Sequence, residues 1–336
     1  MTLEEILKRR VIVLSGKGGV GKSVLTATLA LIASRTGKRV LIVELDTIET
    51  VPHFFGVSHV QPYTEVALHE HISSLHIDGK SALEEYLRMV LKSKKIAERV
   101  FRSPVYKYFV EVAPGLKELM TIGKIWDLEQ SRVPRTDTPK YDLLVVDTPA
   151  TGHTSSYFRM PQAAVKTIKR GFVRKEAQKV ADLLQDSDKI LFNIVTTLEE
   201  LPVNETMDLY GILVHQLQLP VGCIFANKMF PSFPEGEDLT QYLEWKGSVL
   251  EGSPNHGEVA LTHETEYSVL SCAESWRKRR NNHELYADKL RKTLPCDIYP
   301  VPLLFSPDVN LTFIEGLAQA MTSGPRVLDH MHACFT

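Results

Sequence analysis

The chain of 336 residues has few cysteines, no long apolar run and no excess of charge of either sign. Its four cysteines, Cys223, Cys272, Cys296 and Cys334, are far apart and form no C-x-x-C pair. This pattern disfavours a disulfide framework or a zinc site and fits reduced thiols. No apolar stretch reaches the ~18 residues that a membrane span needs. Residues 1–10 are charged and lack an apolar core, so we expect no signal peptide and a cytoplasmic protein.

Basic and acidic side chains nearly balance, with 39 Lys and Arg against 41 Asp and Glu and a formal net charge of -2. No global field therefore attracts nucleic acid or an anionic membrane, and we expect no nucleic-acid partner. Hydrophobic residues make up 43% and charged residues 24% of the chain, which is typical of globular proteins. The length allows one large α/β domain or two smaller ones.

The most informative segment is a glycine-rich loop that lies between an apolar run, Val11–Leu14, and a helical pattern, Val24–Ala33. It matches the phosphate-binding pattern G-x-x-x-x-G-K-[ST] in the strand–loop–helix setting that this pattern requires. Glycines let backbone N–H groups point at phosphate oxygens, and the helix N-terminus adds a positive field. We predict that Lys22 reaches the β- and γ-phosphates of ATP or ADP and that the Ser23 hydroxyl binds Mg²⁺. The predicted nucleotide-binding residues are Gly16, Gly18, Gly19, Val20, Gly21, Lys22, Ser23 and Val24.

A second lysine, Lys17, is not needed to hold phosphate, because backbone amides and Lys22 already do so. A flexible cation on the outer side of the loop suits a nucleotide that a second subunit holds. There it could stabilise transition-state charge, as an arginine finger does in trans. The alternative is a solvated loop lysine. The segment Lys17–Ser23 resembles the deviant phosphate loop of dimerising ATPases, a group that includes MinD, ParA, nitrogenase iron protein and ArsA.

The remaining pattern predicts an α/β fold with a doubly wound, mostly parallel sheet. The predicted strands are apolar on consecutive positions, which indicates burial on both faces. They are Arg10–Ser15, Arg39–Asp46, Tyr141–Asp147, Lys189–Thr196, Pro220–Asn227 and Ile298–Leu304. Two long stretches, about 60–139 and 155–186, predict a helical subdomain inserted into a single domain 1–336. Within the first, Ser81 and Glu84 form the pattern of a capping box.

Three carboxylates end predicted strands near the loop. Asp147 ends an apolar run and is placed to bind the Mg²⁺ shell. The hydroxyl- and glycine-rich segment Thr148–Thr154 follows it and can sense a γ-phosphate. Asp46 could orient the attacking water, with a helix N-cap as the alternative. We expect Glu44 to have a structural role, and His153 to pack or cap rather than to react.

The base site is expected after the later strands. Asn227, with Lys228 next to it, can hydrogen-bond the adenine edge, and Phe230 stands where a guanine-specific site usually has an aspartate. This favours ATP over GTP. The segment Pro302–Asn310 could close over the base, with Pro302 at its start. The run Arg277–Arg280 reads as a solvated helix face, or otherwise as a site for an anionic partner.

These residues together carry a family resemblance that spans nearly the whole chain. Asp147-Thr-Pro-Ala-Thr-Gly-His-Thr154 is similar to D-T-A-P-T-G-H-T, the switch II segment of the ArsA family. That family includes the arsenite pump ATPase and the ATPase that targets tail-anchored membrane proteins. The resemblance implies an ATP-dependent homodimer with a helical subdomain. It also implies that Lys17 acts between subunits, Asp46 activates water, Asp147 supports the metal and Asn227 meets adenine.

The chain also departs from the family pattern. Thr47-Ile48-Glu49-Thr50 replaces the frequent Pro-Ala-His-Asn, and neither the zinc-binding C-x-x-C nor the metalloid-binding cysteines are present. The eight methionines are scattered, and the tail around His330–Cys334 is expected to be disordered. The leading hypothesis is an ATP-hydrolysing dimeric switch whose helical subdomain engages a protein client or a membrane-associated partner. The alternatives are a MinD- or ParA-like positioning ATPase and a phosphotransferase. The cargo stays open between a metalloid, a tail-anchored membrane protein and another protein.

Overall fold

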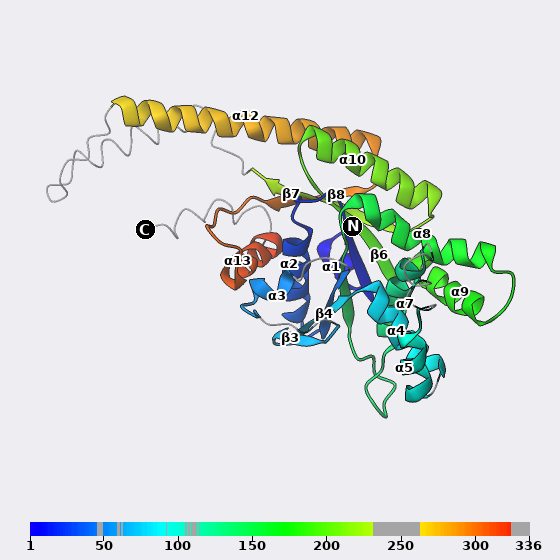
Figure 1. Cartoon of the computed structure of the whole chain (residues 1–336). Coiled ribbons are helices and arrows are strands. Elements are labelled where there is room, and N and C mark those ends of the chain that lie inside the picture. Colours follow the sequence, from blue (N-terminus) through cyan, green and yellow to red (C-terminus); the bar gives the residue numbers. More distant parts are fainter. Residues whose placement is uncertain are drawn as a thin grey trace.

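The computed structural model describes residues 1–45, 50–58, 61, 63–91, 93–104, 106, 108, 113, 115–230 and 263–323. An eight-stranded sheet lies at the centre, in the order β3-β4-β2-β5-β1-β6-β7-β8 (Figure 1). Its strands are β1 (Val11–Ser15), β2 (Val40–Leu45), β3 (Val66–His69), β4 (Ile72–Ile77), β5 (Leu143–Asp147), β6 (Ile190–Thr197), β7 (Val221–Met229) and β8 (Asp297–Pro302). Every neighbouring pair is parallel except β3 and β4. The predicted doubly wound, mostly parallel sheet is confirmed.

Helices cover both faces of the sheet. Ile12 and Leu14 of β1 face a core with α1 (Leu3–Leu7), α2 (Lys22–Ser34), α3 (Val51–Phe54) and α13 (Leu311–Thr322). Val11 and Val13 face the opposite core, built with helices that include α7 (Leu116–Gln130), α10 (Glu200–Gly211) and α12 (His263–Thr293). These four side chains are fully buried. Burial on both sides is the reason that the strand reads as a continuous apolar run.

Two strands at one edge of the sheet, β3 and β4, were not predicted. β3 alternates half-buried and exposed positions, and β4 carries Ser73, Ser74 and His76 among its six residues. Short strands of mixed polarity give a weak sequence signal because only one face or part of a face is buried. Both strands fall inside the stretch that we assigned to the inserted helices.

Five helices pack against one another on one side of the sheet (Figure 1), and we call them the helical layer. They are α4 (Gly79–Leu91), α5 (Lys94–Arg102), α7, α8 (Thr151–Thr167) and α9 (Phe172–Gln185). α7, α8 and α9 share the main core with the sheet. α4 and α5 meet around a separate small cluster centred on Leu83 and Tyr106. The boundaries of the predicted subdomain stay a prediction.

The start of α4 differs from the predicted capping box. The helix begins at Gly79, and the Ser81 backbone N–H donates to the carboxylate of Asp78 at 2.9 Å, so Asp78 caps the helix instead of Ser81. Glu84 pairs with Arg88 one turn later, at 3.8 Å. Gly79 also allows α7 to approach, because a Cβ there would lie 2.6 Å from the Cβ of Lys117.

The late part of the chain adds a long helix. α12 runs beside α10 along the upper side of the molecule in Figure 1, and α10 continues into the π-helical turn η1 (Ile212–Gln216). No helix among the described residues is long and apolar enough to cross a bilayer. Residues 231–262 and the tail around His330–Cys334 lie outside the described residues.

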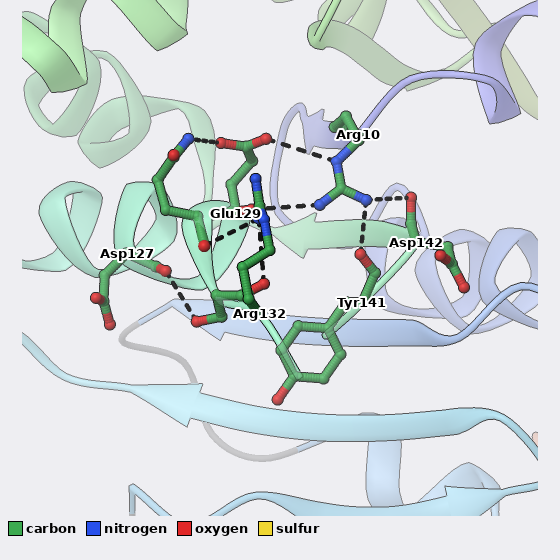
Figure 2. A network of polar contacts seen from close by, with 8 residues as sticks. Arg10, Asp127, Glu129, Arg132, Tyr141 and Asp142 are labelled. Atoms are coloured by element: carbon green, nitrogen blue, oxygen red, sulfur yellow. Dashed lines mark hydrogen bonds and ion pairs between the residues drawn. The ribbon is translucent and has the colours of Figure 1, made fainter. Parts of the chain in front are cut away.

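A polar network joins α7 to the amino-terminal ends of β1 and β5 (Figure 2). Arg10 donates from Nη1 to the carbonyl oxygens of Tyr141 at 2.6 Å and Asp142 at 3.1 Å, and from Nη2 to that of Glu129 at 3.2 Å. Its Nε lies 3.5 Å from Oε1 of Glu129, whose side chain is only 4% exposed. The network therefore fastens the end of α7 to the amino-terminal ends of central strands, opposite the ends that carry the glycine-rich loop.

Candidate nucleotide site

The glycine-rich loop joins β1 to α2, and two of its glycines are required by close contacts. Gly16 has φ 152°, and a Cβ there would lie 2.2 Å from the carbonyl oxygen of Val195. Gly21 has φ 93°, and its Cβ would lie 2.3 Å from Nδ2 of Asn227. A side chain at position 16 would displace the backbone of β6, and one at position 21 would displace the side chain of Asn227, so the loop's shape depends on glycine here.

Lys22 lies inside this loop. It is the first residue of α2, and its Nζ donates to the carbonyl oxygens of Gly16 and Lys17, both at 3.0 Å. The residue is 9% exposed. Burial lowers the pKa of its ammonium, and the nearby Asp147 carboxylate partly offsets that effect. The loop thus holds a cation at its centre, as the phosphate-binding pattern predicts.

Asp147 ends β5 beside this cation and is 2% exposed. Burial raises the pKa of its carboxyl to about 6, against the opposing effects of a hydrogen bond from Ser23 and the charge of Lys22. Within the described part of the chain, its buried Oδ1 has no hydrogen-bond partner. An oxygen in this position next to a hydroxyl is the kind of ligand set that suits a hard divalent cation.

The other loop lysine is held elsewhere. Nζ of Lys17 lies 2.7 Å from Oε1 of Glu205 on α10, and the two side chains are 28% and 34% exposed. The two lysines of the loop therefore have different environments. Lys22 is enclosed by backbone oxygens, whereas Lys17 forms an ion pair with a helix far away in the sequence. Nothing in the sequence predicted this pairing.

Asn227 lies against the same loop. Its Nδ2 donates to the carbonyl oxygen of Val20 at 2.7 Å, and its Oδ1 accepts from the backbone N–H of Lys228 at 2.9 Å. The residue is 5% exposed, and Lys228 itself is exposed with φ 57°. Pro302 ends the adjacent strand β8, opposite Met229. The three residues predicted to meet the base therefore share one edge of the sheet, and Asn227 also supports the phosphate loop.

The segment that follows β8 is attached to α12 by aromatic rings. Trp276 stacks on Phe305 with ring centroids 5.3 Å apart, and it meets Phe230 edge-on at 5.7 Å. His283 of the same helix packs against Phe230 at 5.3 Å. Phe305 belongs to the segment predicted to close over the base, so α12 is linked to that segment. This cluster was not predicted from the sequence.

Part of the predicted site lies outside the described residues, including Asp46 and the three residues after it, and also the side chains of Thr151–Thr154 with His153. Glu44, which precedes this gap, is 1% exposed, and its Oε1 accepts from the backbone N–H groups of Thr50 at 2.8 Å and Val51 at 3.1 Å. It thereby caps α3 and holds the chain just after Asp46, which is the structural role expected for it.

The cysteines that the structure describes, Cys223, Cys272 and Cys296, are free. Over the same residues there is no cluster of three or more His, Cys, Asp or Glu side chains arranged to hold a metal ion.

A glycine loop between a buried strand and a helix, with a lysine enclosed at the carboxyl ends of parallel strands, defines a P-loop nucleotide-binding protein. The family model of anion-transporting ATPases matches residues 9–177. The chain belongs to this family, as the switch II resemblance predicted, and is a P-loop ATPase.

Relatives of known name support the same assignment. ATPase BagA of Mycobacterium tuberculosis is 32% identical over 240 residues, which cover 70% of this chain and 69% of the relative. A protein of Aquifex aeolicus that carries the name "Putative arsenical pump-driving ATPase 2" is 26% identical over 280 residues, which cover 74% of this chain and 89% of the relative. ATPase get3 of Schizosaccharomyces japonicus is 24% identical over 170 residues, 50% of this chain and 49% of the relative.

Proposed function

We propose that this ATPase works as a homodimeric switch in which Mg-ATP closes two subunits and hydrolysis moves the helical layer. The main support for this proposal is that the two lysines of the loop have different surroundings. Lys22 is enclosed by the carbonyl oxygens of Gly16 and Lys17, so one cation already serves the phosphates. Lys17 is held at the side of the loop by Glu205 and is available for a nucleotide bound by the other subunit.

The metal fits the residues present. Ser23 and Asp147 would hold Mg²⁺, because a hydroxyl and a buried carboxylate oxygen lie together at the start of α2. When bound, the cation would neutralise charge on the β- and γ-phosphates. The amides of Gly16–Val24 would bind the phosphates, and Asn227, Lys228 and Pro302 would contact the base. Asp46, which follows β2, would orient the attacking water.

A direct structural route from this site to the helical layer supports the switch. β5 ends at Asp147, and α8 begins at Thr151. Phe158 of α8 is fully buried and packs edge-on against Phe192 of β6, with ring centroids 4.7 Å apart. α8 in turn contacts α7 and α9. A shift of the Thr148–Thr154 segment on loss of the γ-phosphate would therefore be passed to the layer, which engages the partner or cargo.

The test separates the two lysines. Lys22→Ala should weaken nucleotide binding, because the phosphates lose their enclosed cation. Lys17→Ala should leave binding of a fluorescent ATP analogue nearly intact and slow hydrolysis by about 10³-fold or more, the range for a cation supplied in trans. Mixing the two inactive variants should restore turnover, since the Lys22→Ala subunit still supplies Lys17 to its partner. A Lys17→Ala protein that hydrolyses ATP at the parental rate would refute the cross-subunit role.

The coupling to the helical layer has a separate measurement. Hydrogen exchange should differ between the ATP-analogue and ADP states across residues 60–139, and unchanged exchange there would refute the coupling. An Asp46→Asn protein should stall with ATP bound and retain its partner in a pull-down.

A further inference from the structure

The outer face of α5 carries an unusual set of charges. Lys95, Arg99 and Arg102 are exposed, follow the i, i+4, i+7 spacing of one helix face and line the same open hollow as Glu98 and Ser103. The opposite face of the helix packs inward through Ala97, which is 1% exposed, and through Val100 and Phe101. The inward packing fixes the three cations toward solvent.

Large apolar side chains are exposed in the same stretch of the chain, at the end of α4, on α5 and shortly after it. Met89 and Val90 at the end of α4 are 62% and 45% exposed, Ile96 on α5 is 54% exposed, and Tyr108 is 67% exposed. They are four of the ten large apolar side chains that are exposed in the described part of the chain. Single exposed apolar residues are ordinary, but a group of them marks an interaction surface. We call this group, together with Arg88, Lys95, Arg99 and Arg102, the basic tip.

Arg88 joins the two helices of the basic tip. Its guanidinium lies 5.2 Å from the ring centroid of Phe101, and its side chain is 62% exposed. The tip has its own small core around Leu83 and Tyr106. It lies at the far end of the helical layer from α12 (Figure 1).

The sequence through the basic tip is strongly cationic in a chain of net charge -2. Between Arg88 and Lys107 there is one acidic residue, Glu98, and there are seven basic ones, Arg88, Lys92, Lys94, Lys95, Arg99, Arg102 and Lys107. The other basic run, Arg277–Arg280 on α12, has Glu274 and Glu284 close by, and Arg280 is bound to Glu284. Arg277, Lys278 and Arg279 of that run are exposed, so they provide a control in which three surface cations can be reversed with the same change in net charge.

We propose that the basic tip docks on the surface of an anionic lipid bilayer. Basic side chains that lie beside aliphatic ones match such a surface, because the cations meet the headgroups and the apolar groups enter the acyl boundary. Nucleic acid would engage the cations but offers little to Met89, Val90 and Ile96. This inference deepens the proposed function, in which the helical layer engages a partner.

Vesicle sedimentation of the full chain without nucleotide tests the docking. We expect binding to phosphatidylcholine vesicles that contain phosphatidylglycerol and little binding to phosphatidylcholine alone. The triple variant Lys95→Glu/Arg99→Glu/Arg102→Glu should reduce partitioning by about 100-fold or more, because each basic residue near the surface contributes about a factor of five. The matched variant Arg277→Glu/Lys278→Glu/Arg279→Glu makes the same change in net charge and should bind within about twofold of the parent if the tip is the docking site.

Two further variants sharpen the result. Met89→Ser/Ile96→Ser should weaken binding even at high salt, where screening leaves mainly the apolar contribution. The neutral variant Lys95→Gln/Arg99→Gln/Arg102→Gln replaces the charge reversal if a thermal melt shows that the latter does not fold.

The proposal is overturned if the parent does not bind anionic vesicles. Equal loss in both triple variants, or stronger binding of the tip to duplex DNA than to vesicles, would also overturn it. ATP turnover is measured on each variant without vesicles and should equal that of the parent. A failure of the switch mechanism would therefore appear in the lysine-variant experiments and not in the sedimentation.

Discussion

Replacing Glu205 with glutamine removes the carboxylate that holds Lys17 within its own subunit. The two charged atoms are 2.7 Å apart, and the side chains are 28% and 34% exposed. Such a partly exposed pair contributes about 0.2–1 kcal/mol. The fraction of released Lys17 should therefore rise by about 1.4- to 5-fold. Because each subunit of the dimer must release its lysine, the association constant should rise by the square of this factor, about 2- to 25-fold.

The assay is sedimentation equilibrium with a non-hydrolysable ATP analogue, together with ATP turnover measured against protein concentration. Glu205→Gln should shift the midpoint of both curves to lower concentration. Glu200→Gln removes a charge from the same helix α10, where Glu200 is exposed, and should leave both curves unchanged.

A double-mutant cycle isolates the ion pair. In a Lys17→Ala background, Glu205→Gln should have no effect on association, since its only action is through the lysine. The reasoning is refuted if Glu205→Gln leaves the dimer unchanged or weakens it. It is equally refuted if the gain persists without Lys17.

Three other predictions follow from the site and the fold. Burial raises the pKa of Asp147 to about 6, so below that pH the carboxyl is protonated and Mg²⁺ must displace a proton to bind. In titrations with ATP, the apparent Mg²⁺ affinity should be constant above pH 7 and fall about tenfold per pH unit below pH 6. Asp147→Asn should remove this pH dependence. Asn227→Ala should lower stability by about 1–2 kcal/mol in urea unfolding and weaken nucleotide affinity, whereas Asn193→Ala, which removes another buried strand asparagine, should lower only stability. Arg10→Met should lower the free energy of unfolding by about 3 kcal/mol, because it leaves the Glu129 carboxylate buried without its ion-pair partner. Arg10→Met/Glu129→Leu should recover much of that loss. Equal stability of the single and double variants would contradict the prediction.

The central strands could be predicted from the sequence because burial on both faces requires a continuous run of apolar residues. The run Val11–Leu14 and the end of β5 at Asp147 were correctly located for this reason. The phosphate loop was recognisable because a short pattern dictates its local geometry. Membership in the anion-transporting ATPase family followed from switch II, which is equally local.

The features that were not predicted depend on contacts between residues far apart in the sequence, on a choice between two possible helix caps or on weak strand patterns. The Lys17–Glu205 pair joins residues 188 positions apart, and the bond from Asn227 to Val20 spans 207. Nothing near either residue encodes its partner. At α4 two capping residues, Asp78 and Ser81, lie close together in the sequence, and the Asp78 carboxylate makes the cap. The edge strands β3 and β4 lacked the continuous apolar signal of the centre.

The anchoring of Glu129 by Arg10 decides how α7 can travel. Its last turn is fastened to the base of the sheet, whereas its first turn follows Gly115, where a Cβ would lie 2.1 Å from the sulfur of Met160 on α8. With its last turn held in this way, α7 cannot slide along the sheet and can move only by rotating about that turn. A displacement of α8 at this free end would therefore turn the first turns of α7 about its anchored end, and α4 with the basic tip, which packs against the same end of α7, would move with them.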